Sequence, residues 1–421
     1  MANLSLGDYT SVLKDILLPY VRDNFPKKTI LLDQVKRDAG LHMMNDEFIF
    51  PLYTTRHGGI AALADDNNLV TKSGGRDTSR GTVAVKRLYA ALDISKLTID
   101  ASRNNTLAVE GALEGQTKRL TADFARTVNR QLYSDGVGVV SMVRATGGSV
   151  GAGTIAVAAI TASIDDARTV DWYGTINGDI SPTKYFAPDQ IIGVGTGGAA
   201  DGTITSVTGT SIVSGAPTAI VTAANDSVYI QDGSGEGAGS SELVGIRAAL
   251  SSTTGTSTYA GVARNVNGWT PAFGSASEAL TLDRLTSSYI SASEFADPED
   301  KFIILVNATL YRRYGNVLTS MRQSVNEADL LGGWKGLSFA AGGKVAGVFL
   351  DFEVPDGEAL VINLDSWALA QVSDAGWVED GAPGSMLRLS DSIVYQAVMT
   401  WFVNAVCLAP AANGRQTRKT A

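Results

Sequence analysis

The chain has 421 residues, of which 44% are hydrophobic and 18% are charged, and its formal net charge is −9. This length allows two or three domains with a sizeable core, and the apolar content is too high for a disordered protein. The negative charge excludes a dedicated nucleic-acid binder whose affinity depends on neutralising phosphates. The charge is uneven, because nine acids and two bases fall between Ala145 and Ser240, which leaves the rest of the chain at −2.

Targeting and redox signals are weak. Cys407 is the only cysteine, which excludes an internal disulfide, and the apolar run around it predicts a buried, inert thiol. The first residues, "MANLSLGDYTSVLKD", lack the basic and apolar segments of a signal peptide, so we expect folding in a reducing cytoplasm. The run "VYQAVMTWFVNAVCLAP" is interrupted by polar residues and is too short for a membrane span, and it predicts a buried strand.

The N-terminal part predicts an arm followed by a hairpin. Residues 8–40 indicate short helical pieces interrupted by prolines, with a last turn or two ending at Gly40, and we expect them to pack on another part of the molecule. "DEFIFPLY" (46–53) and "GTVAVKRLYAALDIS" (81–95) predict strands that form an extended hairpin. Its connector of nearly thirty residues is long for a compact domain, which marks it as functional or as ordered by a partner.

The strongest helical signal spans residues 106–133. Apolar residues at spacings of four and seven form one stripe, and charged residues occupy the other faces. Acids near the start and arginines near the end suit the helix dipole, and Asp135-Gly136 can end the helix. At 1.5 Å per residue it would be roughly 40 Å long and could serve as a spine. The stripe consists of Val109, Leu113, Leu120, Phe124, Val128 and Leu132.

Residues 138–240 are rich in Gly, Ala, Thr, Ser, Val and Ile, with short strand-like runs. Asp201-Gly202 and Thr208-Gly209 read as turns, so we predict a small antiparallel β unit or barrel inserted into another domain.

Beyond the insertion, two helices, a strand followed by a helix, and three strand-rich runs are predicted. The second of the two helices, "LTLDRLTSSYISAS", is expected to place Leu282, Leu285, Tyr289 and Ile290 on its apolar side. The strand and helix form "KFIILVNATLYRRYGNVLTSM".

Motifs for catalysis or cofactor binding are not convincing. Lys72-Ser73-Gly74-Gly75 reverses the order of a P-loop and leads into a strand, and the glycines between 233 and 239 alternate, which misses the spacing of a dinucleotide fingerprint and indicates a flexible loop. The two histidines, His42 and His57, have no partner at metal-ligand spacing and complete no catalytic triad. We therefore predict that the protein is not an enzyme and has neither a metal site nor a cofactor.

The broken arm, the basic hairpin and the oversized helix each expose extended surface that a monomer cannot bury. Together they indicate a building block whose appendages are ordered by neighbouring copies.

The order and length of these elements resemble a tailed-bacteriophage major capsid protein of the Hong Kong 97-like fold. The resemblance covers nearly the whole chain apart from about 140–235, and it includes "FIFPLY", "FIILVNATLYRRYGN" and the closing run from "LGGWKGLSF" to "VYQAVMTWFVNAVCLAP". It implies an α+β fold with six regions. These are an N-terminal arm (1–45), an E-loop hairpin with peripheral-domain strands (46–95), a spine helix of the peripheral domain (96–137), a β-rich insertion in or near the axial domain (138–240), axial and peripheral helices with a strand (241–340), and peripheral and axial strands with a C-terminal tail (341–421).

The resemblance also implies a function and partners. The chain would self-assemble as hexamers and pentamers into the icosahedral head shell of a tailed bacteriophage that encloses double-stranded DNA. It would be located in the virion after assembly in the cytoplasm of the host bacterium. Implied partners are a separate scaffolding protein, a portal, a decoration protein and packaged DNA contacted without sequence specificity, with no membrane.

Contact residues follow from the same resemblance, because the E-loop would lie over an adjacent subunit. Some relatives cross-link an E-loop lysine to a peripheral-domain asparagine of another subunit. Lys72 and Asn404 have the right residue types, although the local motif and an assisting glutamate are not matched. The candidate inter-subunit contacts are Arg56, His57, Lys72, Arg76, Arg80 and Lys86.

Two alternatives stay open. One is the shell of an encapsulin-like nanocompartment, and the other, from a different class, is a nucleotide-binding enzyme with a Gly-rich loop.

Overall fold

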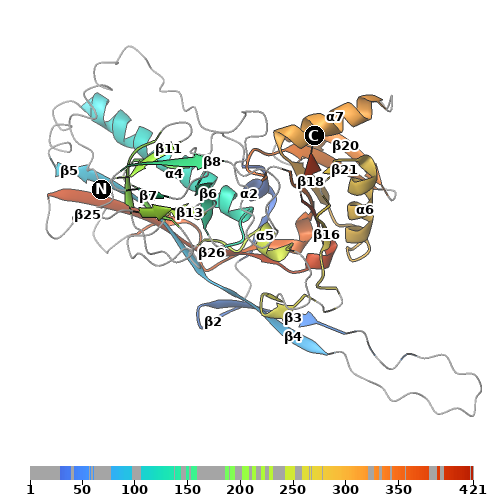
Figure 1. Cartoon of the computed structure of the whole chain (residues 1–421). Coiled ribbons are helices and arrows are strands. Elements are labelled where there is room, and N and C mark those ends of the chain that lie inside the picture. The colour runs from blue at the N-terminus through green and yellow to red at the C-terminus, as the bar shows by residue number, and fades with distance from the viewer. Residues whose placement is uncertain are drawn as a thin grey trace, which may run out of the picture.

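A computed structural model describes most of the chain from residue 29 onward (Figure 1). The residues outside the described set are 1–28, 39–41, 56, 58–59, 61–76, 97–105, 137, 144–147, 151–152, 159–184, 189, 195–201, 208–210, 215–219, 223–226, 231–241, 252–257, 265, 267, 277, 321–326, 331–333, 342–343, 356, 379–385, 389–392, 418 and 421.

The first large sheet has six strands and is built around the 14-residue strand β26. One edge of β26 pairs with β5, from Val403 opposite Lys86 to Val394 opposite Ser95. Its other edge pairs in turn with β23, β24 and β25, and β23 also pairs in parallel with β1. The strands are β1 (Lys36–Asp38), β5 (Lys86–Ser95), β23 (Trp367–Gln371), β24 (Gly376–Trp377), β25 (Met386–Arg388) and β26 (Val394–Cys407).

The predicted long helix is confirmed as α4 (Thr106–Leu132), and its C-terminal half packs against this sheet. Val128 and Leu132 are buried, whereas Leu120 and Phe124 are only partly buried. The apolar stripe therefore enters the core progressively toward the C-terminal end of the helix. The side chains of Val109 and Leu113 lie outside the described set.

In the segment before residue 40, the helix is shorter than predicted. Helix α2 (Ile30–Gln34) ends at Gln34, because the next residues form β1 and pair with β23. Ile30, Leu31 and Leu32 are buried, and the amide of Leu32 donates to Asn129 Oδ1 of α4 at 3.1 Å. The expectation that this segment packs on another part of the molecule is confirmed for α2, but its extension to Gly40 was wrong.

The predicted hairpin is confirmed, with a third strand at its edge. β3 and β4 pair antiparallel from Glu47 opposite Ala84 to Tyr53 opposite Thr78. β2 joins β3 through a two-residue turn, Asn45 and Asp46, in which both residues have positive φ. The run predicted as one strand at 81–95 divides at Val85 into β4 and β5, which belong to different sheets. The strands are β2 (His42–Met44), β3 (Glu47–Tyr53) and β4 (Thr78–Ala84).

The inserted β unit is confirmed as a closed barrel in the order β10-β11-β8-β6-β13-β9, in which neighbouring strands are antiparallel. It lies on the left in Figure 1, in front of α4. Ile192, Ile204 and Val228 are buried and join the same core as α4. Its strands, together with the separate pair β7 and β12, are β6 (Val139–Val143), β7 (Gly148–Val150), β8 (Gly153–Ala158), β9 (Ile191–Val194), β10 (Gly202–Val207), β11 (Ser211–Ser214), β12 (Ile220–Thr222) and β13 (Ser227–Ile230).

The second large sheet has seven strands in the order β16-β27-β22-β18-β21-β20-β19. Helices α6 (Leu282–Ser293) and α7 (Ala308–Ser320), both predicted from the sequence, pack on one face of it in a second core. The prediction for Ile290 was wrong, because this side chain is 51% exposed while Leu285 and Tyr289 are buried. The strands are β16 (Ala272–Gly274), β18 (Phe302–Val306), β19 (Glu327–Leu330), β20 (Trp334–Ala341), β21 (Lys344–Leu350), β22 (Ala359–Asn363) and β27 (Gly414–Gln416).

Short elements link the two large sheets. They are α5 (Ile246–Ala249), the hairpin of β14 (Thr258–Tyr259) and β15 (Val262–Ala263), the parallel pair of β17 (Glu278–Ala279) and β28 (Lys419–Thr420), and the 3-10 turns η1 (Leu364–Ser366) and η2 (Pro410–Ala412).

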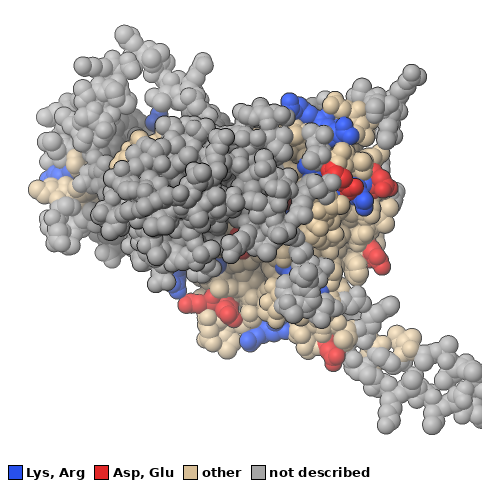
Figure 2. Space-filling view, in the orientation of Figure 1, with Lys and Arg blue, Asp and Glu red and all other residues tan. Residues whose placement is uncertain are grey.

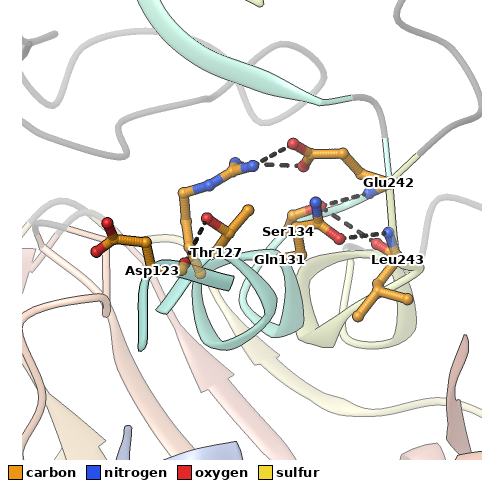
Figure 3. A network of polar contacts seen from close by, with 8 residues as sticks. Asp123, Thr127, Gln131, Ser134, Glu242 and Leu243 are labelled. Atoms are coloured by element: carbon orange, nitrogen blue, oxygen red, sulfur yellow. Dashed lines mark hydrogen bonds and ion pairs between the residues drawn. The ribbon is translucent and has the colours of Figure 1, made fainter. Parts of the chain in front are cut away.

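A buried ion pair holds the segment that follows the barrel against the C-terminal end of α4. Arg130 forms a two-pronged contact with Glu242, with one Nη1–Oε2 distance of 3.2 Å, and Gln131 and Ser134 bind the backbone of Leu243 (Figure 3). A side chain at Gly245 would clash with the backbone of Leu132, with a Cβ at 2.3 Å from its carbonyl oxygen. The glycine and the paired charges therefore allow this close approach.

A second buried charge cluster joins the C-terminal strand to α5. Arg415 binds Glu358 through Nε at 3.0 Å and Nη2 at 2.6 Å, and Arg247 lies 3.6 Å from the same carboxylate. Burial opposes the charged form of Glu358, but the two arginines outweigh it and lower the pKa of this carboxyl below its ordinary value.

The predicted burial of Cys407 is confirmed. Within the described residues, no helix has both the length and the apolar character that crossing a membrane requires. Those residues also contain no group of three or more His, Cys, Asp or Glu side chains that could bind a metal.

Candidate assembly surfaces

The base of the β3–β4 hairpin is anchored in the core. Phe48, Phe50 and Val83 point inward and are at most 5% exposed. Gly81 lies opposite Phe50, and a Cβ there would come within 2.5 Å of the Phe50 ring. The aromatic ring therefore occupies the space that a side chain at Gly81 would need.

An aromatic cluster ties this base to the first sheet. The Trp269 ring lies 6.3 Å from Phe50 and 5.9 Å from Tyr259, and the Tyr259 hydroxyl accepts a hydrogen bond from the amide of Cys407 on β26 at 2.9 Å. The amide of Thr82 donates to the carbonyl of Ala260 at 2.9 Å. These contacts therefore fix the base of the hairpin to the first sheet.

The distal half of the hairpin is exposed. Pro51, Thr78 and Arg80 are exposed, and Tyr53 is 70% exposed. β3 and β4 lie below the body of the molecule in Figure 1. Where the strands end, the amide of Thr54 donates to the carbonyl of Asp77 at 3.0 Å, which continues the pairing by one step.

The predicted contact residues fall on different parts of the chain. Arg80 is exposed on β4, and His57 is exposed beyond the end of β3. Lys86 instead starts β5 in the first sheet, where it is half-buried, and burial lowers its pKa. The structure therefore does not place these residues in one cluster.

The other predicted contacts, Arg56, Lys72 and Arg76, lie outside the described set, as do the Lys72–Gly75 sequence and the glycines between 233 and 239. Sequence reasoning overlooked Arg87, which forms an exposed ion pair of 3.2 Å with Asp46 in the β2–β3 turn. The strong turn signal Asn45-Asp46 could have indicated that turn.

Asn404 has a structural role within the chain. Its side chain is fully buried, its Oδ1 accepts from the amide of Val244 at 2.8 Å, and its Nδ2 donates to the carbonyl of Ala84 at 2.6 Å. In this chain both polar atoms of the amide are therefore bonded to the chain itself. The role of Asn404 as a cross-link acceptor stays a prediction.

The hairpin sheet also presents an apolar surface that the sequence did not reveal. Met43 and Met44 on β2 are 48% and 56% exposed, and they line an open groove with Ile49, Pro51 and Arg80. β2 has only three residues, so its pattern was too short to be recognised.

The outer face of the six-stranded sheet carries a second exposed surface. Phe402 lies opposite Arg87 in the β26–β5 register, and the next outward pair is Thr400 and Tyr89. Tyr89 is 60% exposed, Phe402 is 37% exposed, and Val372, whose amide donates to the carbonyl of Phe402, is 48% exposed. Since α4 covers the inner face through Val128 and Leu132, this outer row is directed away from the core. We call it the sheet platform.

The architecture, two sheets with helices on single faces plus a projecting hairpin and an inserted barrel, is that of an α+β protein. Comparison with solved structures identifies the class. The chain is similar to a subunit of the cyanophage A-1(L) capsid, with a TM-score of 0.55, 12% identity and coverage of 96% of both chains. This likeness over nearly the full length shows that the chain has the fold of a phage capsid subunit.

Other solved structures match less well. One is the capsid of a native GTA particle (TM-score 0.46, 11% identity, 99% of this chain and 100% of that chain). Another is an encapsulin complex from Synechococcus elongatus (TM-score 0.41, 8% identity, 100% and 97%). No family model and no curated protein matches the sequence.

Proposed function

We propose that the protein is the major capsid protein of a tailed bacteriophage, a structural subunit that self-assembles into the head shell. The observation that carries this proposal is the likeness to a capsid subunit across nearly the whole chain. A hairpin with an anchored base and an exposed distal half supports it, because such an element finds little apolar contact on its own body.

In this proposal the hairpin is the E-loop and lies over an adjacent copy. Its exposed apolar side chains, Met43, Met44 and Tyr53, would pack on the sheet platform of that copy, at Tyr89 and Phe402. Burial of apolar surface contributes about 25 cal/mol per Å², so a few large side chains at each contact supply more than exposed ion pairs, which contribute ~0–1 kcal/mol each. Basic residues such as Arg80 then orient the contact more than they strengthen it.

The remaining parts take the corresponding roles. The six-stranded sheet with α4 as spine helix forms the peripheral domain, and the seven-stranded sheet with α6 and α7 forms the axial domain. The barrel is an additional domain inserted into this arrangement. A scaffolding protein, a portal, a decoration protein and packaged DNA are the proposed partners, and the virion is the proposed location. A structural subunit of this kind needs no catalytic site.

Removal of the hairpin tip tests the proposal. We would replace residues 61–76 with a short Gly-Ser linker, which leaves β3, β4 and the contact between Thr54 and Asp77 intact. The expected product is a folded, soluble subunit that forms no closed shells in electron micrographs, whereas the parent chain assembles. The urea midpoint of the unassembled variant should match that of the parent, because the anchored base of the hairpin is left unchanged.

Two results would contradict the proposal. Normal shells from the deletion variant would refute the role of the hairpin, and a parent chain that stays monomeric under all assembly conditions would refute the capsid function. Nucleic acid inside shells produced during infection supports a phage head. Enclosed enzyme without nucleic acid would instead indicate a nanocompartment, and tight stoichiometric nucleotide binding by a monomer would indicate an enzyme.

A further inference from the structure

The outer side of α6 and the residues that follow the helix carry two exposed apolar side chains and four exposed carboxylates. Ile290 lies in the last turn of α6 and is 51% exposed, and Phe295, two residues beyond the end of the helix, is 46% exposed. We call this surface the α6 patch, and its acidic members, all exposed, are Asp283, Glu294, Asp297 and Glu299.

Packing fixes the direction of the α6 patch. Leu285 and Tyr289 face the seven-stranded sheet, and the Tyr289 ring meets the Phe302 ring edge-on at 5.1 Å. The helix cannot rotate to bury Ile290 without exposing these side chains. Residues 282–301 contain five acids and two bases, so the region carries a net charge of −3, and one of the bases, Arg284, is bound to Glu278 at 2.8 Å.

Helix α7 has the opposite charge. It contains Arg312 and Arg313 and has no acidic residue. Arg312 and Asn316 are exposed, and Arg313 is half-buried with an Nε that has no hydrogen-bond partner in the described part of the chain. We call this surface the α7 patch. Its orientation is set by Leu310, Tyr314 and Leu318, which are buried on the opposite side of the helix.

Both helices cover the same face of the seven-stranded sheet, and their patches are directed outward. In Figure 1 α7 lies across the top of this lobe and α6 along its right side. Figure 2 shows basic side chains gathered at the top, over α7, and acidic side chains below them on the right, over α6. Within one molecule the inner sides of the helices are occupied by the core, so the outward patches cannot turn toward each other.

We infer that the α6 patch of one copy binds the α7 patch of a second copy. The inference rests on the proposed function, since it requires that copies meet in a shell. Opposite net charges select this pairing over α6 with α6 or α7 with α7, where like charges would repel. Because two different surfaces meet, the contact is head to tail, and repeated contacts of this kind close into a ring when the rotation between neighbouring copies divides a full turn. Ile290 and Phe295 supply the apolar centre of the contact, and the charges form its rim.

A charge exchange tests the pairing. One variant carries Glu294→Arg and Glu299→Arg, a second carries Arg312→Glu and Asn316→Glu, and a third carries all four substitutions. We expect each of the first two to assemble at least about tenfold more slowly than the parent at low salt, because the patches then repel, and the third to recover most of the parent rate. Light scattering measures the rate, and 1 M NaCl should reduce the differences.

A further variant, Ile290→Ser, tests the apolar centre with the charges unchanged. It should slow assembly without lowering the urea midpoint of the unassembled chain, because the side chain is exposed in the monomer. Parent-like assembly of both charge variants, or a fourfold variant no better than they are, would overturn the inference. In those cases the parent still assembles, so the proposed function stands. A parent chain that never assembles would refute the proposed function and the inference together.

Discussion

Replacement of Asn404 by alanine is the most direct test of how the hairpin, the barrel return and the first sheet are held together. The Asn404 side chain is fully buried and bridges three segments: β26 itself, the end of β4 at the Ala84 carbonyl, and the chain before α5 at the Val244 amide. Alanine removes both the acceptor and the donor. The carbonyl of Ala84, an exposed residue, and the amide of Val244, a half-buried residue, then lose these partners.

The magnitude follows from these contacts. The half-buried Val244 amide left without a partner costs about 1–2 kcal/mol, and the Ala84 carbonyl costs less than this because water can reach an exposed residue. A small cavity in place of the amide adds to this. We therefore expect the free energy of unfolding of the unassembled subunit to fall by about 2–4 kcal/mol.

Urea unfolding followed by tryptophan fluorescence measures this change, since Trp401 lies on the same strand and its Nε1 donates to Gln371 Oε1 at 3.2 Å. The matched control is Asn316→Ala, because Asn316 is exposed, and its effect should stay below about 0.5 kcal/mol. If Asn404→Ala unfolds at the same urea concentration as the control, the bridging role of this amide is wrong.

Three further predictions concern the core. Leu132→Ala should lower the free energy of unfolding in urea by about 2–5 kcal/mol, because Leu132 is 2% exposed. Leu120→Ala should lower it clearly less, because Leu120 is only partly buried. Equal effects of the two substitutions would show that the increase in burial along α4 is wrong. Burial raises the pKa of the Cys407 thiol to about 12, so the folded chain at pH 8 should resist alkylation by iodoacetamide and react only after unfolding. Mass spectrometry detects the alkylated thiol, and rapid labelling of the native chain would contradict this prediction. Arg415 and Arg247 hold the pKa of Glu358 below its ordinary 4.5, so the ionised carboxylate adds stability above that pH, and this contribution is lost as the pH falls through the lower folded-state pKa. Glu358→Gln should therefore be less stable than the parent at pH 7 and should lose less stability on acidification. Parallel profiles of stability against pH for the two proteins would refute this.

Some features missed in the sequence had a local signal. Asn404 interrupts an otherwise apolar strand, "WFVNAVC", and a polar side chain at such a position usually has buried hydrogen-bond partners. Asn413 is a second case, since its Oδ1 accepts from the Asn363 amide and from Trp367 Nε1 in a buried site. The partners on other strands and loops, however, lie 46 to 320 residues away in sequence and could not be named from the pattern.

The sequence by itself determined the helices and strands whose hydrophobic residues repeat at a helical or strand period, because such a repeat lies within one segment. The 3.6-residue period predicted α4, α6 and α7, alternation and β-branched content predicted β3, β18 and β26, and turn residues at short intervals predicted the barrel. Their order along the chain was enough to indicate the capsid fold, because in that fold the sequence of long and short elements is itself distinctive.

Only the tertiary structure decided which segments share a sheet and which side chains become buried. The run 81–95 divides between two sheets, residues 36–38 become a strand through pairing with β23, and Ile290 remains exposed although its helix is amphipathic. The physical reason is that strand pairing, burial and ion pairing are set by partners distant in sequence, as for Arg130 and Glu242, which are separated by 112 residues.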